Sequence, residues 1–439
     1  MSAMKLNPRS VQVGRARVNT AYTGREAGAT SSTHSFERAP SSSLQDRAVS
    51  QPSSLNFDLK QDAESPTAIV LKKPATNATA APSASYYKLE HVTIPSKPLG
   101  ENEVVVKILA AGLNHRDLFI RRNLYPGIAF GSPLLSDGCG IVTNTGSSSE
   151  AKKWIGKRIV ISPASGWDRD PRAPESPNGL AYLGANKLNT NGTLTDELVI
   201  ASDQLEEAPE HLTAVQAASL PLAGLTAWRA VVTKSEAASP GKNVLITGIG
   251  GGVAQLALFF AVSKGAKVYV TSGDQAKLRA AKDLGATDGV SYREKDWDRE
   301  LLKKLPKDRP PFDAIIDGAG GDIVRRGVRL LKAADSLVIQ PGGVVVIYGM
   351  TQDPTMPFSM SAVLRHLEIR TVTGGSRREF HKMMEHVAKH RITPVISRVA
   401  RDWKTPREVE SLFEDMAKGK QFGKLVIEVG KEEGRGSKI

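Results

Sequence analysis

Segment 243–254, NVLITGIGGGVA, places the strongest constraint on how this chain can fold. An apolar run ends directly in a cluster of glycines, and an apolar, helix-like stretch at 253–264 follows it. Glycines between a strand and a helix permit a tight turn and let the backbone approach a pyrophosphate, whose oxygens the first N–H groups of the helix can bind. In this context the cluster predicts a dinucleotide site, with a merely structural turn as the alternative; the predicted contacts are Gly248, Gly250, Gly251, Gly252 and Val253.

Strands and helices alternate around this segment. Apolar strands, with helix-like segments between them, are expected at 243–247, 267–271, 312–317 and 343–348. This alternation is typical of an α/β fold with a parallel sheet that helices cover on both faces. Before it, short β-branched runs between Pro and Gly turns predict an all-β region, at 68–73, 103–109 and 158–162. The chain is expected to close with two helices and a strand, at 380–390, 406–419 and 424–428.

The end of the second strand of this alternation bears on the choice of dinucleotide. Thr271, Ser272 and Gly273 stand there, without the carboxylate that usually binds the ribose 2′-hydroxyl of NAD. Lys277 begins the next helix, which Asp274 is expected to cap. A hydroxyl and an ammonium group suit the 2′-phosphate of NADP(H). The sequence therefore favours NADP(H) over NAD(H), although Lys277 also fits a solvated surface lysine.

Composition limits the remaining possibilities. The 439 residues suffice for two or three domains. The formal net charge of +13 suits either nucleic acid or an anionic ligand and does not choose between them. Cys139 is the single cysteine, which excludes a disulfide framework and a zinc site made of several thiolates. No apolar run approaches the ~20 residues that a membrane-spanning helix needs, so no membrane partner is expected.

Residues 1–65 differ from the rest of the chain. They are rich in Ser, Thr, Ala and Arg and lack helical or strand periodicity, as expected of a disordered extension. Several basic residues precede the first acidic one, Glu26, which is the composition of a transit peptide, but few bulky apolar residues are present to form a helix face. A cytoplasmic location is expected, with a mitochondrial one as the alternative if residues 1–60 contain a transit peptide.

A series of motifs resembles a known family. It runs through AGLNHRD at 111–117, YPG at 125–127, SDGCG at 136–140, GTL at 192–194, LPLAGLTAW at 220–228, the glycine turn, LGA at 284–286 and GKLV at 423–426. Over roughly 68–429 the chain resembles the medium-chain dehydrogenase/reductase superfamily, and most closely its zinc-free quinone oxidoreductase and enoyl reductase branch, which is alcohol dehydrogenase-like in sequence.

The resemblance implies a GroES-like β-barrel domain and a Rossmann domain with substrate bound in the cleft between them. The domain boundaries expected on this basis are a disordered extension at 1–65, the first part of the GroES-like domain at 66–222, the Rossmann domain at 223–376, a segment that returns to complete the GroES-like domain at 377–430, and a tail at 431–439.

The resemblance also bears on metal chemistry. Zinc-dependent members bind a catalytic zinc through a Cys in the first motif and a Gly-His-Glu segment in the second. This chain has Asn114 at the first place and Ser136 and Asp137 at the second, and Asn and Ser are poor zinc ligands. No zinc is expected. The resemblance then implies hydride transfer from NADPH to a small electrophilic molecule, either an activated C=C bond (an α,β-unsaturated carbonyl) or a quinone, with Asn114 donating a hydrogen bond to the developing charge.

The proton donor is left open. Many relatives in this branch carry a Tyr where this chain has Phe119, so that water, Tyr125 or His115 would supply the proton. In zinc-dependent members the position of His115 often contacts the cofactor phosphates, and a structural role is the third alternative. Arg116 and Asp117 are expected to form an ion pair or a cap at the helix start rather than to take part in chemistry.

The remaining predicted cofactor contacts also come from the resemblance. It places near the cofactor Thr226, Tyr292, Gly349, Met350 and Lys424. Two alternative functions stay open: a cofactor-binding protein with little turnover and some nucleic-acid binding, and an enoyl reductase for acyl chains. Nucleic acid is the weaker expectation because no motif of interleaved aromatic and basic residues is present. A homodimer, with the edge strand of the Rossmann sheet as the place to look, is also considered.

Overall fold

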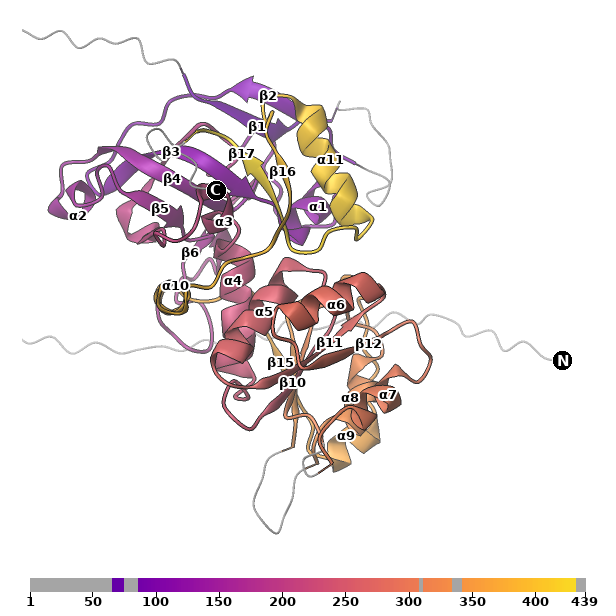
Figure 1. Cartoon of the computed structure of the whole chain (residues 1–439). Coiled ribbons are helices and arrows are strands. Elements are labelled where there is room, and N and C mark those ends of the chain that lie inside the picture. Colours follow the sequence, from indigo (N-terminus) through magenta and orange to yellow (C-terminus); the bar gives the residue numbers. More distant parts are fainter. Residues whose placement is uncertain (1–64, 75–85, 308–310, 334–341, 432–439) are drawn as a thin grey trace, which may run out of the picture. The chain divides into compact units, whose positions relative to one another are not determined.

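The computed structural model describes residues 65–74, 86–307, 311–333 and 342–431. The predicted N-terminal extension, apart from Ser65, and the tail after Lys431 lie outside these residues. Two large sheets organise the described part of the chain (Figure 1).

The first large sheet has six parallel strands in the order β12-β11-β10-β13-β14-β15. In chain order they are β10 (Asn243–Ile246), β11 (Lys267–Ser272), β12 (Asp288–Ser291), β13 (Ala314–Asp317), β14 (Val344–Ile347) and β15 (Glu368–Thr371). Numbered along the chain, the order is 3-2-1-4-5-6, which is that of the Rossmann fold. The predicted parallel sheet is confirmed, and so is the Rossmann topology that the resemblance implies.

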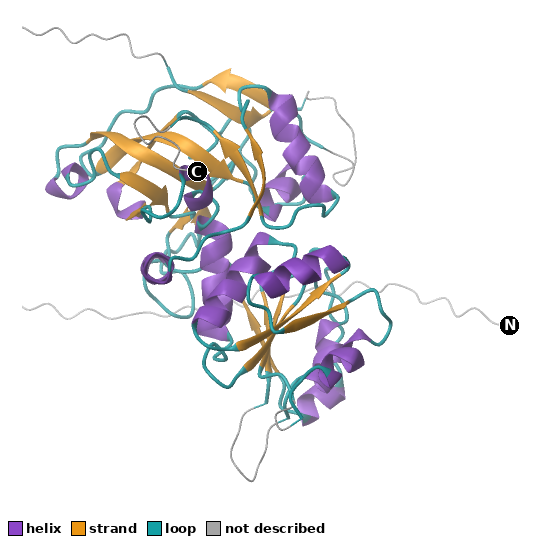
Figure 2. Ribbon diagram, viewed as in Figure 1, coloured by secondary structure: helices purple, strands orange, loops and turns teal. Residues whose placement is uncertain are grey.

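Helices cover both faces of this sheet, as Figure 2 shows. Alternate strand residues point to opposite faces, so that Val244 and Ile246 pack in one apolar cluster and Leu245 in another. The first cluster includes apolar residues of α5 (Gly252–Ser263). The second includes residues of the helices on the other face, α7 (Trp297–Lys303), α8 (Ile323–Leu330) and α9 (Met360–Leu364). α6 (Gln275–Asp283) contacts β11 and β12.

The second large sheet is mainly antiparallel and has seven strands. They are β3 (Glu103–Gly112), β4 (Asp137–Thr145), β5 (Arg158–Ile161), β8 (Glu197–Ala201), β9 (Leu205–Glu207), β16 (Ile396–Ala400) and β17 (Lys424–Glu428). β17 pairs with β3, with Val426 opposite Gly112, so the end of the chain completes a sheet that begins before the Rossmann strands. Two smaller sheets consist of β1 (Thr67–Leu71) with β2 (Leu89–Thr93), and of β6 (Ala164–Ser165) with β7 (Ala181–Tyr182).

The remaining helices connect or flank the two large sheets. They are α1 (His115–Arg121), α2 (Ser149–Lys152), α3 (Ala214–Ala217), α4 (Pro221–Trp228), α10 (Arg377–His390) and α11 (Pro406–Ala417), with a short 3₁₀ turn η2 (Ser202–Gln204) and a π-helical turn η3 (Arg229–Lys234). None of the helices in the described residues is both long enough and apolar enough to cross a membrane.

Candidate active site

A cavity of about 590 Å³ lies at the carboxyl ends of the central Rossmann strands. Its wall includes the residues that follow β10, β13 and β14, namely Gly248, Gly318 and Gly349. Ligands of open parallel sheets gather at this place, where the strand order reverses. The cavity brings together every residue that the sequence predicts for the site: Asn114, His115, Tyr125, Thr226, Gly248, Gly250, Gly251, Gly252, Val253, Ser272, Lys277, Tyr292, Gly349, Met350 and Lys424.

The glycine turn has the geometry that its sequence requires. Gly248 has a φ of +64°, a left-handed conformation that glycine adopts without strain. α5 begins at Gly252, one residue before the predicted start, with Gly251 at the N-cap. Ala254 is completely buried, as expected for a small residue that lets the helix lie close to the strand. The first N–H groups of α5 have no acceptor within the helix and lie at the cavity, where they can bind phosphate oxygens.

Segment 419–423 lies against this turn. The N–H of Gly423 donates to the carbonyl oxygen of Gly250 at 3.0 Å. The ammonium group of Lys277 donates to the carbonyl oxygens of Gly419, at 2.8 Å, and Gln421, at 2.9 Å. Lys277 is therefore a half-buried residue of the cavity wall, held at the glycine turn by two carbonyl groups. Since an ammonium group has three donors, one remains for a further acceptor.

Asp274 caps the helix that carries Lys277, as predicted. Its Oδ1 accepts a hydrogen bond from the N–H of Ala276 at 2.7 Å. The cap fixes the start of α6 beside the end of β11, where Ser272 lies on the same cavity wall.

A buried ion pair joins Lys424, which lines the cavity, to Asp137 behind it. The ammonium group of Lys424, at the start of β17, donates to Asp137 Oδ2 at 2.9 Å, to Asn114 Oδ1 at 2.8 Å and to the carbonyl oxygen of Leu113 at 2.7 Å. Lys424 is 5% exposed and Asp137 is completely buried. The other oxygen of Asp137 accepts from the N–H of Leu222 in the first turn of α4 at 2.8 Å. The resemblance suggested that Lys424 approaches the cofactor; in the structure its donors are all used by the protein.

Asn114 stands at the N-cap of α1. Its N–H donates to Asp117 Oδ2 at 2.9 Å, and Asp117 forms an ion pair with Arg116, which confirms the predicted capping and pairing. Burial raises the pKa of Asp117 to about 6, although Arg116 and the Asn114 N–H act in the opposite direction. The side-chain Nδ2 of Asn114 is buried and has no hydrogen-bond partner among the described residues.

His115 lines the cavity and is half-buried. Burial lowers its pKa, and the positive charges of Lys424 and Arg122 lower it further. The imidazole is therefore neutral at neutral pH. A neutral ring can form a hydrogen bond with a ligand, but it carries no positive charge for an ionic contact with phosphate.

Aromatic residues form the wall around Arg116. Its guanidinium group lies 5.2 Å from the ring centre of Tyr125 and 5.4 Å from that of Tyr182, and it donates to the carbonyl oxygens of Leu183 and Gly184. Burial raises the pKa of Tyr182, so its hydroxyl stays protonated. Phe119, in the place of the family's Tyr, also lines the cavity.

Tyr182 and Asp317 are cavity residues that the sequence did not single out. Tyr182 comes from the irregular segment between β5 and β8, in which no periodicity identifies a cleft residue. Asp317 ends β13, and its carboxylate accepts from Thr247 Oγ1 at 2.5 Å and from the N–H groups of Ala319 and Gly320. Burial raises its pKa. The signal in the sequence that could have identified Asp317 as a cavity residue is its place as a polar residue at the end of a central strand.

Comparisons with known proteins agree with this architecture. Residues 100–210 match the family model described as Alcohol dehydrogenase GroES-like domain, and residues 252–389 match the one described as Zinc-binding dehydrogenase. The zinc-type alcohol dehydrogenase-like protein YogA of Leptosphaeria maculans is 45% identical over 350 residues, which cover 78% of this chain and 95% of that protein. The chain belongs to the medium-chain dehydrogenase/reductase superfamily.

Other members of the superfamily extend the comparison. A zinc-type alcohol dehydrogenase-like protein of Schizosaccharomyces pombe is 31% identical over 322 residues, which cover 71% of this chain and 87% of that protein. A crystal structure of an NAD-dependent alcohol dehydrogenase superposes with a TM-score of 0.70 at 27% identity and covers 83% of this chain and all of that one. This medium-chain dehydrogenase/reductase is thus an oxidoreductase related to alcohol dehydrogenases.

The residues at the family's zinc position form a different donor set. Asn114 and Asp137 both accept hydrogen bonds from Lys424, and Ser136 has a buried hydroxyl without a partner among the described residues. The part of the chain that the structure describes contains no cluster of three or more His, Cys, Asp or Glu side chains that could hold a metal ion.

Proposed function

We propose that this chain is a zinc-free, NADPH-dependent reductase that transfers hydride to a small electrophile, either an α,β-unsaturated carbonyl compound or a quinone. The observation that carries the proposal is the Lys424–Asp137 ion pair. The second motif of the family, which provides zinc ligands in zinc-dependent members, here provides a carboxylate that is already bonded to a buried ammonium group.

The donor set at this place does not fit a catalytic zinc. Asparagine and serine are poor ligands for zinc compared with thiolate and imidazole. A divalent cation bound by Asp137 would also lie next to the ammonium group of Lys424, and two like charges in a buried place repel each other strongly. Oxidation of a simple alcohol needs stabilisation of an alkoxide, for which zinc-dependent members use the metal. Reduction of a conjugated bond spreads its charge onto an oxygen, which hydrogen-bond donors can stabilise.

The residues around the glycine turn fit NADP(H). The first N–H groups of α5 can bind the diphosphate, and the remaining donor of Lys277, together with Ser272, can bind the 2′-phosphate. The related crystal structure is that of an NAD-dependent enzyme by its title. In this chain β11 ends in Thr271 and Ser272 without a carboxylate, so the feature that usually selects NAD is not at this strand end.

When bound, NADPH supplies the hydride. The residues of the glycine turn would bind the cofactor, Thr226 and Gly349 would lie beside its nicotinamide ring, and Phe119, Tyr125 and Tyr182 line the same cavity on the side proposed for the substrate. These aromatic rings give this side of the cavity an apolar surface that suits a small conjugated substrate. The proton that completes the product would come from water, Tyr125 or His115, since both residues line the cavity.

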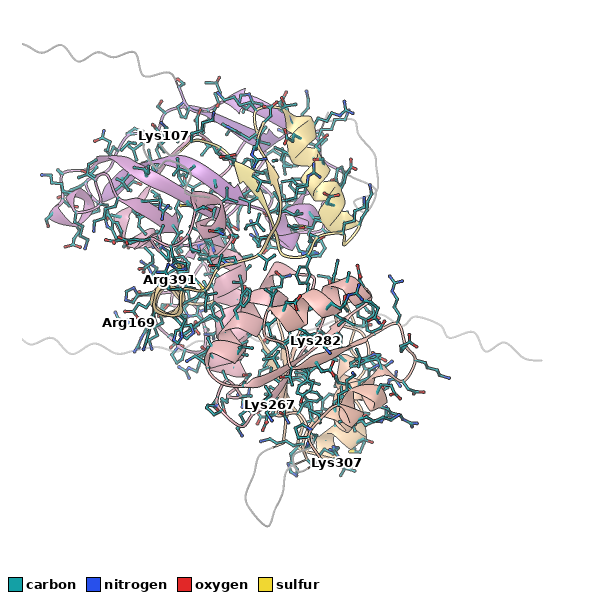
Figure 3. All side chains as sticks on the ribbon, in the orientation of Figure 1. Lys107, Arg169, Lys267, Lys282, Lys307 and Arg391 are labelled. Carbon is teal, nitrogen blue, oxygen red and sulfur yellow. The ribbon has the colours of Figure 1, made fainter. Side chains whose placement is uncertain are left out.

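A small-molecule substrate is favoured over a nucleic acid. The basic side chains labelled in Figure 3 include Lys107, Lys267 and Lys282, which belong to β3, β11 and α6. These basic residues thus come from both large sheets and from a helix, rather than from one element. The concave, partly aromatic cavity is the feature that suits a small ligand.

The test is an NADPH oxidation assay with the purified full chain. Cyclohexenone and naphthoquinone represent the two substrate classes, and simple alcohols with NADP⁺ represent the zinc-dependent chemistry. We expect absorbance loss from NADPH with an enone or a quinone, and no change of that activity after treatment with a chelator. Quenched NADPH fluorescence without consumption would favour the cofactor-binding alternative, and chelator-sensitive alcohol oxidation would contradict the proposal.

A further inference from the structure

Lys424 has no donor left for a ligand. Its three hydrogen bonds, to Leu113, Asn114 and Asp137, have lengths of 2.7, 2.8 and 2.9 Å and use all three N–H groups of the ammonium. Because the group is buried and paired with a buried carboxylate, breaking this arrangement would leave an uncompensated charge. Lys424 is therefore held in one place, and its effect on a ligand has to pass through the groups that it binds.

The bond between Lys424 and Asn114 fixes the orientation of the asparagine amide. An ammonium group can only donate, so the amide must present its oxygen to Lys424. A flipped amide would place its NH₂ group against the ammonium, two donors facing each other. The backbone of Asn114 is fixed as well, because its N–H donates to Asp117 at 2.9 Å. The amide nitrogen must then point away from Lys424.

The amide nitrogen has no protein partner. Asn114 lines the cavity, is 7% exposed, and its Nδ2 is buried without a hydrogen-bond acceptor among the described residues. A buried donor without an acceptor costs about 1–3 kcal/mol. The side-chain polar atoms of Lys424 and Asp137 all have partners, whereas Asn114 Nδ2, like the neighbouring Ser136 Oγ and Arg116 Nε, has none among the described residues. Of these three groups, Asn114 Nδ2 belongs to a residue that lines the cavity and is held in place by Lys424, so that an acceptor supplied by a ligand can satisfy it.

We infer that the Nδ2 group of Asn114 donates to the carbonyl oxygen of the substrate, and that Lys424 is the positioning residue that orients this donor. The inference rests on the proposed function. In an enone the hydride adds its two electrons to the β carbon, and the C=C pair shifts so that the carbonyl oxygen gains negative charge. A proton from water, Tyr125 or His115 then bonds to the α carbon, so that NADPH is oxidised and the enone is reduced. Asn114 stabilises the charge on the oxygen.

The surrounding chain is built to hold Lys424 in this position. A Cβ atom on Gly252 would lie 2.6 Å from Cδ of Lys424, so the absence of a side chain at the start of α5 leaves room for the lysine stem. Asp137 is held in turn by Leu222 of α4, the helix that also carries Thr226 on the cavity wall. The donor is thus fixed by α1, β4, β17 and α4 together.

The first experiment needs no variant of Lys424. The full chain, labelled with nitrogen-15 asparagine, is titrated with NADP⁺ and then with cyclohexenone, which the oxidised cofactor cannot reduce. The side-chain amide resonance of Asn114 is assigned by its loss in Asn114→Ala. We expect this resonance to shift when cyclohexenone is added. If the resonance shifts when NADP⁺ is added but does not shift further with cyclohexenone, or does not shift at all, the inference is overturned.

The second experiment tests the positioning role by kinetics. We expect Asn114→Ala to lower kcat with the enone by about 100-fold, as does removal of one donor from an oxyanion site, and Lys424→Met to lower it by at least about tenfold. NADPH affinity, measured by fluorescence, should stay within about twofold, and the double variant should be no slower than Asn114→Ala because both changes remove the same interaction. Lys420→Met changes an exposed lysine shortly before β17 and is the matched control.

Each result has one meaning. If the kcat losses of the two single variants multiply in the double variant, or if Lys424→Met weakens NADPH binding, Lys424 has a structural role and the positioning role is overturned. If Lys424→Met does not fold, Lys424→Met/Asp137→Asn removes both charges together and keeps an acceptor for Leu222. Failure of the proposed function would look different, since the unaltered chain would then consume no NADPH with any enone or quinone.

Discussion

Lys277 is the residue on which the choice of cofactor depends. Its ammonium group lies at the glycine turn, held by the carbonyl oxygens of Gly419 and Gln421, and one donor is free to meet a 2′-phosphate. A fixed cation loses little conformational freedom when it binds a phosphate, so its contribution to NADPH binding should be larger than that of a flexible surface lysine.

We expect Lys277→Glu to weaken NADPH binding at least about tenfold more than NADH binding, because it replaces a charge-assisted hydrogen bond with repulsion of the 2′-phosphate. The measurement is the dissociation constant of each reduced cofactor by fluorescence titration. Arg279→Glu makes the same change of charge at an exposed position of the same helix and should leave the ratio of the two constants nearly unchanged. An equal loss for both cofactors in Lys277→Glu would contradict a role in binding the 2′-phosphate.

Local sequence located the site residues better than it described their partners. The strand end and the helix start identified Ser272 and Lys277, because both positions follow from short-range periodicity. The partner of Lys277 in segment 419–423 is 142 residues away, and Asp137 and Lys424 are separated by 287 residues. Such pairs depend on how β17 returns to β3, and no local pattern records that. Tyr182 was missed for a different reason, because the irregular segment that contains it has no periodicity.

At the scale of elements, periodicity predicted the long and regular helices and strands. The Rossmann strands and α5 were found within a few residues, because a strand buried on both faces is apolar throughout and the glycine turn marks the helix start. The two-stranded sheet of β6 and β7 was not predicted, since each strand has only two residues and lies in an irregular segment.

A buried ion pair contributes to the docking of α10, together with its buried apolar residues. Glu379 accepts from NH1 of Arg229 at 2.7 Å, from Thr233 Oγ1 at 2.6 Å and from the N–H of Ser376 at 2.9 Å. Arg229 is 1% exposed, and its guanidinium group also lies 4.4 Å from the ring centre of Trp167. The pair thus joins the start of α10 to η3, and the cap of the helix uses the same carboxylate.

We expect Glu379→Ala to lower the free energy of unfolding by about 3–5 kcal/mol, because Arg229 would be left buried without its counter-charge. Urea unfolding followed by tryptophan fluorescence measures this loss. Arg229→Met/Glu379→Leu removes both charges and should be more stable than Glu379→Ala. Glu414→Gln breaks an exposed pair with Lys418 and should change stability by less than about 1 kcal/mol. A Glu379→Ala variant as stable as Glu414→Gln would show that the pair contributes little.

At the scale of the whole molecule, the Rossmann sheet ends in two edge strands, β12 and β15, of which β15 bears on a homodimer. β15 is the last strand of the sheet, so the backbone groups on its outer side have no partner strand among the described residues. Ile369 on this strand and Leu364 on α9 are 40% and 74% exposed. An open edge with exposed apolar side chains is a ready template for another strand. The homodimer considered from the sequence would have its interface here.

If two chains pair along β15, size-exclusion chromatography with light scattering should give about twice the chain mass of 47.1 kDa. Leu364→Lys/Ile369→Lys should then shift the mass to that of one chain, because each interface would bury lysines from both copies facing each other across the symmetry axis. Leu188→Lys alters an apolar side chain that is 57% exposed in the segment before β8 and should not change the mass. If the double variant is still a dimer, the dimer uses another surface. If the unaltered chain is monomeric at all concentrations, the edge strand is not an interface. Because both substituted residues lie outside the cavity wall, NADPH binding by the double variant shows whether a single chain completes the site.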